Sequence, residues 1–177
     1  DGSPLYPVPG DDEFVDENKI AIEYLDAADL ALIVGELIET TPQFAGLGEC
    51  VIRVFWVRKA GKERGRPMLG RADAPRGLLR QLSGADFHLK VAANHARDVM
   101  SEEQIRALLF HLLCSCQLDD DDNPRIVGPD FWGYAAEVQR FGAWRVPLRL
   151  AATAFTEAKG DRQLGLFDRR EADNVDQ

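Results

Sequence analysis

Chemically reactive side chains concentrate in one short stretch of the 177-residue chain, residues 111–116. The stretch contains His111, Cys114, Ser115 and Cys116. His111 and Ser115 are four residues apart, so in a helix both lie on one face. Imidazole and thiolate groups are good zinc ligands, whereas a serine hydroxyl is a poor one. His111 and Cys114 are therefore the candidate metal ligands, and His88 and His95 are the remaining histidines that could assist them.

A helix over residues 101–117 must position these groups. It opens with Ser101-Glu102-Glu103-Gln104, a capping box that satisfies the first backbone N–H groups. Apolar side chains then recur at helical spacing and form one stripe: Ile105, Leu108, Leu109, Leu112, Leu113 and Cys116. His111 and Ser115 flank this stripe on the same side. Cys116 lies within the stripe, which favours core packing for its thiol.

The rest of the chain predicts an α+β domain in which a short mixed sheet packs on helices. Helices are expected over 27–40, around Leu78, Leu79 and Leu82 up to Gly84, over 135–140 and over 148–158. Strands are expected over 50–58 and 87–91. In the second strand apolar residues alternate with His88 and Lys90, so we expect one buried face. A basic hairpin arm over 59–74 and an acidic loop over 119–122 complete the pattern.

Composition limits the class of protein. The chain is 45% hydrophobic with a net charge of −9, which argues against a wholly disordered protein. No apolar run approaches the length of a membrane-spanning helix. Three cysteines are too few for a disulfide framework and favour a reducing, cytoplasmic setting.

Charge and proline content divide the chain into three parts. Residues 1–26 are rich in proline and acids and predict a flexible leader, 27–158 form the domain, and 159–177 read as a charged tail. Residues 51–90 are basic, with ten Lys or Arg against three acids. This region could contact phosphates or could form a solvated glycine-rich loop. The side chains concerned are Lys62, Arg64, Arg66 and Arg71.

The order and spacing of several stretches resemble a metallopeptidase family carried by phages and prophages. The stretches are Gly61-Lys62 to Arg71, Leu82 to Phe87, Ser101 to Gln104, His111 to Cys116, Arg125 to Phe131 and Gly142 to Trp144. Together they span about residues 27–158. The resemblance implies a small zincin-like fold in which the 101–117 helix corresponds to the zinc-binding helix.

The residues at the family's functional positions differ. In the family pattern the catalytic Glu follows the first His, and here that position is Leu112. The second zinc-binding His falls at Ser115 and the third at Pro129, so only His111 keeps the family's residue. A catalytic zinc needs three protein ligands and a base for its bound water. The resemblance therefore implies a degenerate H-E-x-x-H site with no catalytic residue and no expected metal or cofactor.

A short motif in the tail resembles the pentapeptide that binds the bacterial sliding clamp. Its defining residues are Gln163, Leu164, Leu166 and Phe167. Three apolar anchors on a charged segment suit insertion into a pocket of a partner. The same side chains could instead dock back onto the chain's own domain.

Three functions follow from these patterns. The favoured one is an inactive metallopeptidase-like protein that binds a host protein, such as the sliding clamp or a replication or defence complex, and inhibits it. The first alternative is an active zinc metallohydrolase with a rearranged ligand set, in which Asp130 or Glu137 supplies the base. The second is nucleic-acid binding through residues 51–90. None of the three requires a membrane.

Overall fold

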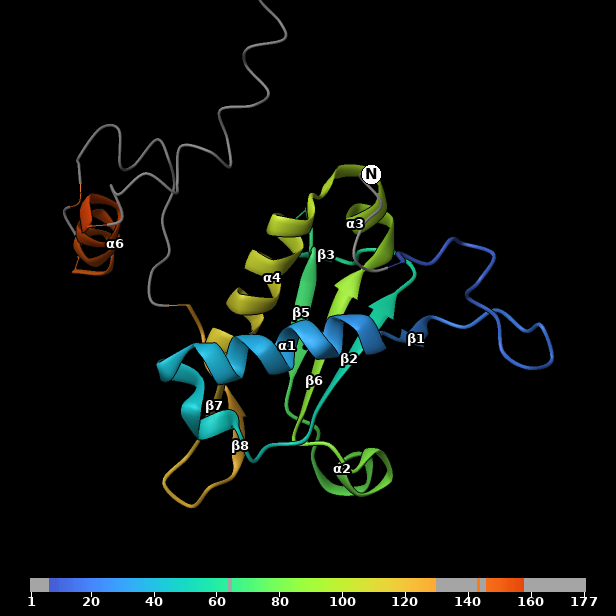
Figure 1. Cartoon of the computed structure of the whole chain (residues 1–177), viewed down its shortest axis with the longest axis horizontal. Helices are drawn as coiled ribbons and strands as arrows, with labels where there is room; N and C mark the ends of the chain where they lie inside the picture. Colours follow the sequence, from blue (N-terminus) through green and yellow to red (C-terminus); the bar gives the residue numbers. More distant parts are fainter. Residues whose placement is uncertain (1–6, 64, 130–142, 144–145, 158–177) are drawn as a thin grey trace, which may run out of the picture. The chain divides into compact units, whose positions relative to one another are not determined.

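The fold described here is a computed structural model of the chain, and it describes residues 7–63, 65–129, 143 and 146–157 (Figure 1). The chain divides into two compact units, residues 1–127 and residues 128–177. The described helix of the second unit is α6, Val146–Glu157, which agrees with the helix predicted over 148–158. The helix predicted over 135–140 and the tail over 159–177 lie outside the described residues.

A four-stranded mixed sheet organises the first unit, with the order β1-β2-β6-β5. The central strands β2 and β6 are parallel, and each edge strand is antiparallel to its neighbour. The strands are β1 (Tyr24–Asp26), β2 (Ile52–Val57), β5 (Gly70–Asp73) and β6 (Phe87–Ala92). The two predicted strands are thus confirmed as the centre of the sheet, and the α+β class is confirmed with them.

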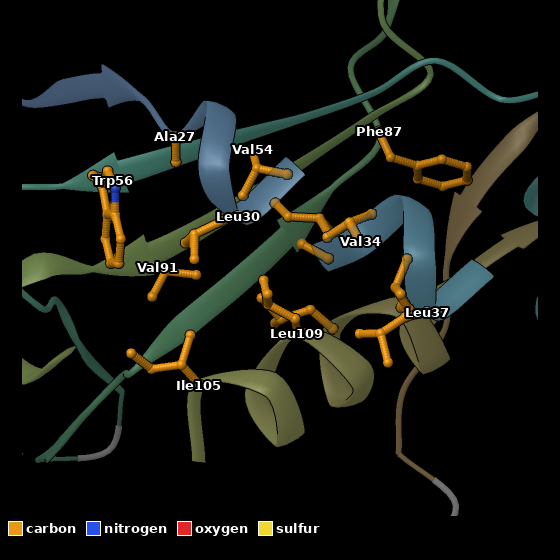
Figure 2. Packing of buried hydrophobic residues seen from close by; sticks show 14 of the residues in the cluster. Ala27, Leu30, Val34, Leu37, Val54, Trp56, Phe87, Val91, Ile105 and Leu109 are labelled. Atoms are coloured by element: carbon orange, nitrogen blue, oxygen red, sulfur yellow. The ribbon is translucent and has the colours of Figure 1, made fainter. Parts of the chain in front are cut away.

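Helices α1 (Ala28–Thr40) and α4 (Glu102–Ser115) cover one face of this sheet. Both were expected, and the capping box at Ser101 and Gln104 is present with both of its hydrogen bonds. The helix α4 ends two residues before its predicted end, because Cys116 begins the next strand. Figure 2 shows the apolar side chains that fill the space between the helices and the sheet: Leu30, Val34, Leu37, Val54, Trp56, Val91, Ile105 and Leu109.

Between β2 and β6 the chain forms several small elements. The predicted basic arm over 59–74 divides into a short hairpin, β3 (Lys62–Glu63) with β4 (Arg66–Pro67), and the sheet strand β5. The helix α2 (Gly77–Ser83) ends at Gly84, whose φ of 62° is a left-handed conformation that glycine adopts readily. Its three leucines are all more than half exposed: Leu78, Leu79 and Leu82.

Four further elements were not expected from the sequence. The helix α3 (Ala93–Val99) follows β6 directly, and a 3-10 helix η1 (Pro42–Leu47) follows α1. The acidic loop predicted at 119–122 closes a hairpin of β7 (Cys116–Leu118) and β8 (Pro124–Ile126). At its turn Asp119 accepts hydrogen bonds from the backbone N–H groups of Asp121 and Asn123.

The segment before α1 differs from the flexible leader expected over residues 1–26. Phe14 is fully buried in the hydrophobic core, and Tyr24–Asp26 form β1. Arg97 of α3 donates a hydrogen bond to the carbonyl oxygen of Pro9 at 2.7 Å. Residues 7–26 are therefore packed on the domain at several points, although proline and acids dominate their composition.

The sheet face opposite α1 and α4 carries polar and aromatic side chains. His88 was expected on an exposed polar face, but only 8% of it is accessible and its Nε2 atom has no hydrogen-bond partner among the described residues. Its ring meets the ring of Phe55 edge-on, with the centroids 5.3 Å apart. Burial lowers the pKa of His88, and the positive charges of Lys90 and Arg53 lower it further.

None of the described helices combines the length and the apolarity that crossing a bilayer requires.

Replacing Phe14 by Ala should destabilise the protein by about 3 kcal/mol, because a fully buried ring would leave a cavity. The matched substitution Ile20→Ala, in a side chain that is 61% exposed, should change stability by less than about 0.5 kcal/mol. Urea unfolding of both variants measures the difference. Equal effects would contradict the packing of this segment.

The lowered pKa of His88 predicts a loss of stability in acid. Below the ordinary pKa of 6.5 the unfolded chain takes up a proton at this residue before the folded chain does. Lowering the pH from about 7.5 to about 5.5, which spans the ordinary histidine range, should reduce Tm more in the natural protein than in His88→Asn. The check is the difference between the two Tm values for each protein, and identical differences would contradict the prediction.

Candidate functional site

An open groove runs between α4 and the edge strand β5, with a volume of about 740 Å³. The β3–β4 hairpin and β8 form its ends. Side chains from four elements line it: Lys62, Glu63, Met68, Leu69, Arg71, Leu108, His111, Leu112, Ser115 and Ile126. The structure thus brings His111 and Ser115 to a common surface, as their spacing predicted.

Gly70 sets how closely α4 approaches β5. A Cβ atom at this position would lie 2.9 Å from the carbonyl oxygen of Lys90 and 3.1 Å from the Cδ1 atom of Leu112. Real side chains do not tolerate such distances without a shift of the backbone. The leucines of α4 therefore pack directly on the backbone of the edge strand. This role of Gly70 was not predicted from the sequence. A glycine within a strand is the feature that could have indicated it.

Leu112 is the floor of the groove. Only 4% of its surface is accessible, and it belongs to the hydrophobic core. Ser115, one turn further along α4, donates its hydroxyl hydrogen to the carbonyl oxygen of Leu112 at 2.6 Å. That hydrogen bond ties the Ser115 side chain to the helix backbone. His111 is exposed and is the polar aromatic group that lines the groove.

The cysteines of α4 and β7 do not line the groove with His111. Cys114 is exposed and accepts a hydrogen bond from Gln43 of η1 at a donor–sulfur distance of 3.6 Å. Cys116 is buried, and burial is the main cause that raises the pKa of its thiol to about 12. A thiol with that pKa is protonated at neutral pH and is a poor metal ligand. Within the described ranges, no three His, Cys, Asp or Glu side chains lie close enough to hold a metal ion together.

The other candidate residues are dispersed. His88 lies on the opposite face of the sheet, and His95 lies on α3. Lys62 and Arg71 both line the groove, but Arg71 belongs to the sheet strand β5 and forms an ion pair with Asp73 at 2.8 Å. Arg66 lies on β4, and Arg64 lies outside the described residues. Asp130, Glu137 and the motif residues Gln163, Leu164, Leu166 and Phe167 also lie outside them.

Residues 22–155, more than half of the chain, match the family described as putative phage metallopeptidase. The chain belongs to this family. The match covers the sheet, the groove and most of α6. It confirms the family resemblance that was inferred from the sequence motifs. Neither a curated protein nor a solved structure matches the chain at a significant level.

Membership of a metallopeptidase family implies a metal, and the residues of this groove do not fit one. His111 is available, but the neighbouring position that should carry the catalytic carboxylate is the buried Leu112. The Ser115 hydroxyl is occupied by a backbone carbonyl, and Pro129 has no side-chain donor atom for a metal.

Replacing Leu112 by Glu tests how firmly this side chain belongs to the hydrophobic core. The new carboxylate would be buried against Gly70 without a hydrogen-bond partner, so we expect a loss of about 3 kcal/mol or more. The matched variant Leu32→Glu, in an α1 side chain that is 75% exposed, should be nearly neutral. Thermal unfolding of the two variants is the measurement. A stable Leu112→Glu protein would mean that this side chain can turn into the groove.

Proposed function

We propose that this chain is a catalytically inactive phage metallopeptidase-like protein that acts by binding a protein of the bacterial host. The observation that carries the proposal is the burial of Leu112 at the position of the catalytic Glu, with its side chain packed against Gly70. Hydrolysis by a metal-bound water needs a base, and a leucine at that position has no proton acceptor to supply it.

The groove beside Leu112 supports binding. In the described sheet β5 is an edge strand, so one side of its backbone is not paired within the sheet. An exposed edge accepts an extended segment of a partner through main-chain hydrogen bonds. The side chains that line the groove combine apolar groups, such as Leu108 and Ile126, with the charges of Lys62 and Arg71. A partner segment would therefore gain both buried area and polar contacts.

A host replication or defence complex is the proposed target, because members of this family are described as phage proteins. The tail supplies a second contact in this proposal. Gln163, Leu164, Leu166 and Phe167 match the apolar and polar anchors of a sliding-clamp ligand. A tail that holds the clamp while the groove holds another segment would increase the overall affinity through effective concentration.

Affinity purification from a host lysate, followed by mass spectrometry, tests the groove and the tail separately. Ile126→Glu places a charge on a groove side chain that is 41% exposed, and it should abolish capture of the groove partner. Leu32→Glu is the matched control and should capture the partner as the natural protein does. Removal of residues 158–177 should eliminate only the clamp. Equal capture by the two Glu variants would overturn the role of the groove.

Metal analysis of the purified protein is the companion measurement. The proposal expects far less than one zinc ion per chain, and His111→Ala should not change that content. Stoichiometric zinc that depends on His111 would overturn the inactive assignment and favour the metallohydrolase.

A further inference from the structure

The second sheet face, opposite α1 and α4, carries a separate constellation of side chains. The strand register places its members in adjacent rows across β1, β2, β6 and β5. The residues of this face are Tyr24, Asp26, Arg53, Phe55, Val57, Arg71, Asp73, His88, Lys90 and Ala92. None of these residues except Arg71 lines the groove beside α4.

This face is accessible in the unit that contains it. Tyr24 is 49% exposed, and the side chains of Arg53 and Arg71 are 41% and 61% exposed. The central strands present less open side chains to this face, since His88 and Ala92 are buried. An open sheet that presents aromatic rings between cations is a surface on which bases can stack while phosphates are neutralised.

Rings and cations alternate across the face in direct contact. The Lys90 ammonium lies 5.3 Å from the centre of the Tyr24 ring, and the Arg53 guanidinium lies 5.0 Å from the centre of the Phe55 ring. Asp73 holds Lys90 and Arg71 at 2.8 Å each. Burial opposes ionisation of Asp73, but hydrogen bonds and charges from Lys90 and Arg71 outweigh it and lower the pKa of this carboxyl. The cations are thus held in place before any ligand arrives.

A pocket of about 230 Å³ opens at the end of this face, where the parallel strands β2 and β6 terminate. Tyr24 forms one wall. Three cations, Lys59, Arg71 and Lys90, line the pocket against one carboxylate, Glu23. Lys59 has no ion-pair partner in the part of the chain that the structure describes. Because Arg71 and Lys90 are already paired with Asp73, Lys59 is the cation that suits a phosphate, and the ring suits a base.

His88 adds a polar atom that the fold itself does not use. Its Nε2 atom is buried, and no group among the described residues forms a hydrogen bond with it. An unsatisfied buried polar group costs free energy, so this strand position is not optimised for stability alone. The His88 ring lies edge-on to Phe55, on which a base would stack.

We propose that the second sheet face binds single-stranded nucleic acid. Bases stack on Tyr24 and Phe55, and phosphates contact Lys59 together with Arg53 and Arg71, whose guanidinium groups are held by Asp26 and Asp73. The basic region 51–90 contributes to this face, because it contains β2, β5 and most of β6. Binding through these cation–phosphate contacts weakens as salt rises, and the acidic remainder of the chain lowers the affinity further. The proposal does not depend on the groove or on the loss of catalysis.

Fluorescence anisotropy of a labelled single-stranded DNA of about 15 nucleotides tests the proposal at low salt. Tyr24→Ala should weaken binding about tenfold through the loss of one stacking platform. Phe155→Ala, in an α6 ring that is 60% exposed, is the aromatic control and should bind as the natural protein does. Lys59→Ala should reduce the slope of log affinity against log salt by about 1, whereas Arg125→Ala should leave the slope unchanged.

Labelled poly-glutamate in the same assay distinguishes a general anion surface from a nucleic-acid site. The proposal expects poly-glutamate to bind more weakly than DNA of equal charge, without sensitivity to Tyr24→Ala. Equal affinity for the two polyanions would overturn the proposal in favour of an acidic peptide. DNA binding that is absent at low salt, or that survives Tyr24→Ala and Lys59→Ala unchanged, would also overturn it.

Discussion

The direct packing of α4 on the backbone of β5 is the constraint on which the rest of this domain depends. Gly70 permits that approach, and Leu108 and Leu112 fill the space that a side chain would occupy. The same contact fixes the edge of the sheet, the floor of the groove and the orientation of His111 towards the groove. A peptidase with a carboxylate at position 112 would have to keep that group accessible to water. In this chain the position has become part of the apolar layer instead.

Much of the secondary structure could be predicted, because the sequence patterns that indicate it are local. The capping box at Ser101, the apolar stripe of α4 and the β-branched composition of β2 each identify an element within about fifteen residues. The groove residues contributed by α4 followed from the same periodicity. The roles assigned to positions 112 and 115 from the order of the motifs stay a prediction.

The remaining features depend on contacts between distant segments, which local patterns do not record. Phe14 lies in a stretch dominated by acids and prolines, and only the core that surrounds it gives it a structural role. The strand β5 is only four residues long, and its residues fall within the basic arm predicted over 59–74. His88 alternates with apolar neighbours as an exposed residue would, yet its side chain is buried beside Phe55. For the same reason the second sheet face could not be assembled from sequence spacing.

The strand order has a consequence for how the chain folds as it is synthesised. β6 pairs with both β2 and β5, so until residues 87–92 have left the ribosome β5 has no partner in the sheet and β2 has only β1. The hairpin arm, β5 and α2 must wait as an open loop, and closing a loop of that length slows the search for the parallel pairing. α4 follows only a few residues later and covers the sheet as it forms. The nascent chain therefore exposes β5 and one edge of β2 throughout that interval, and a ribosome that paused before residue 87 would prolong the exposure.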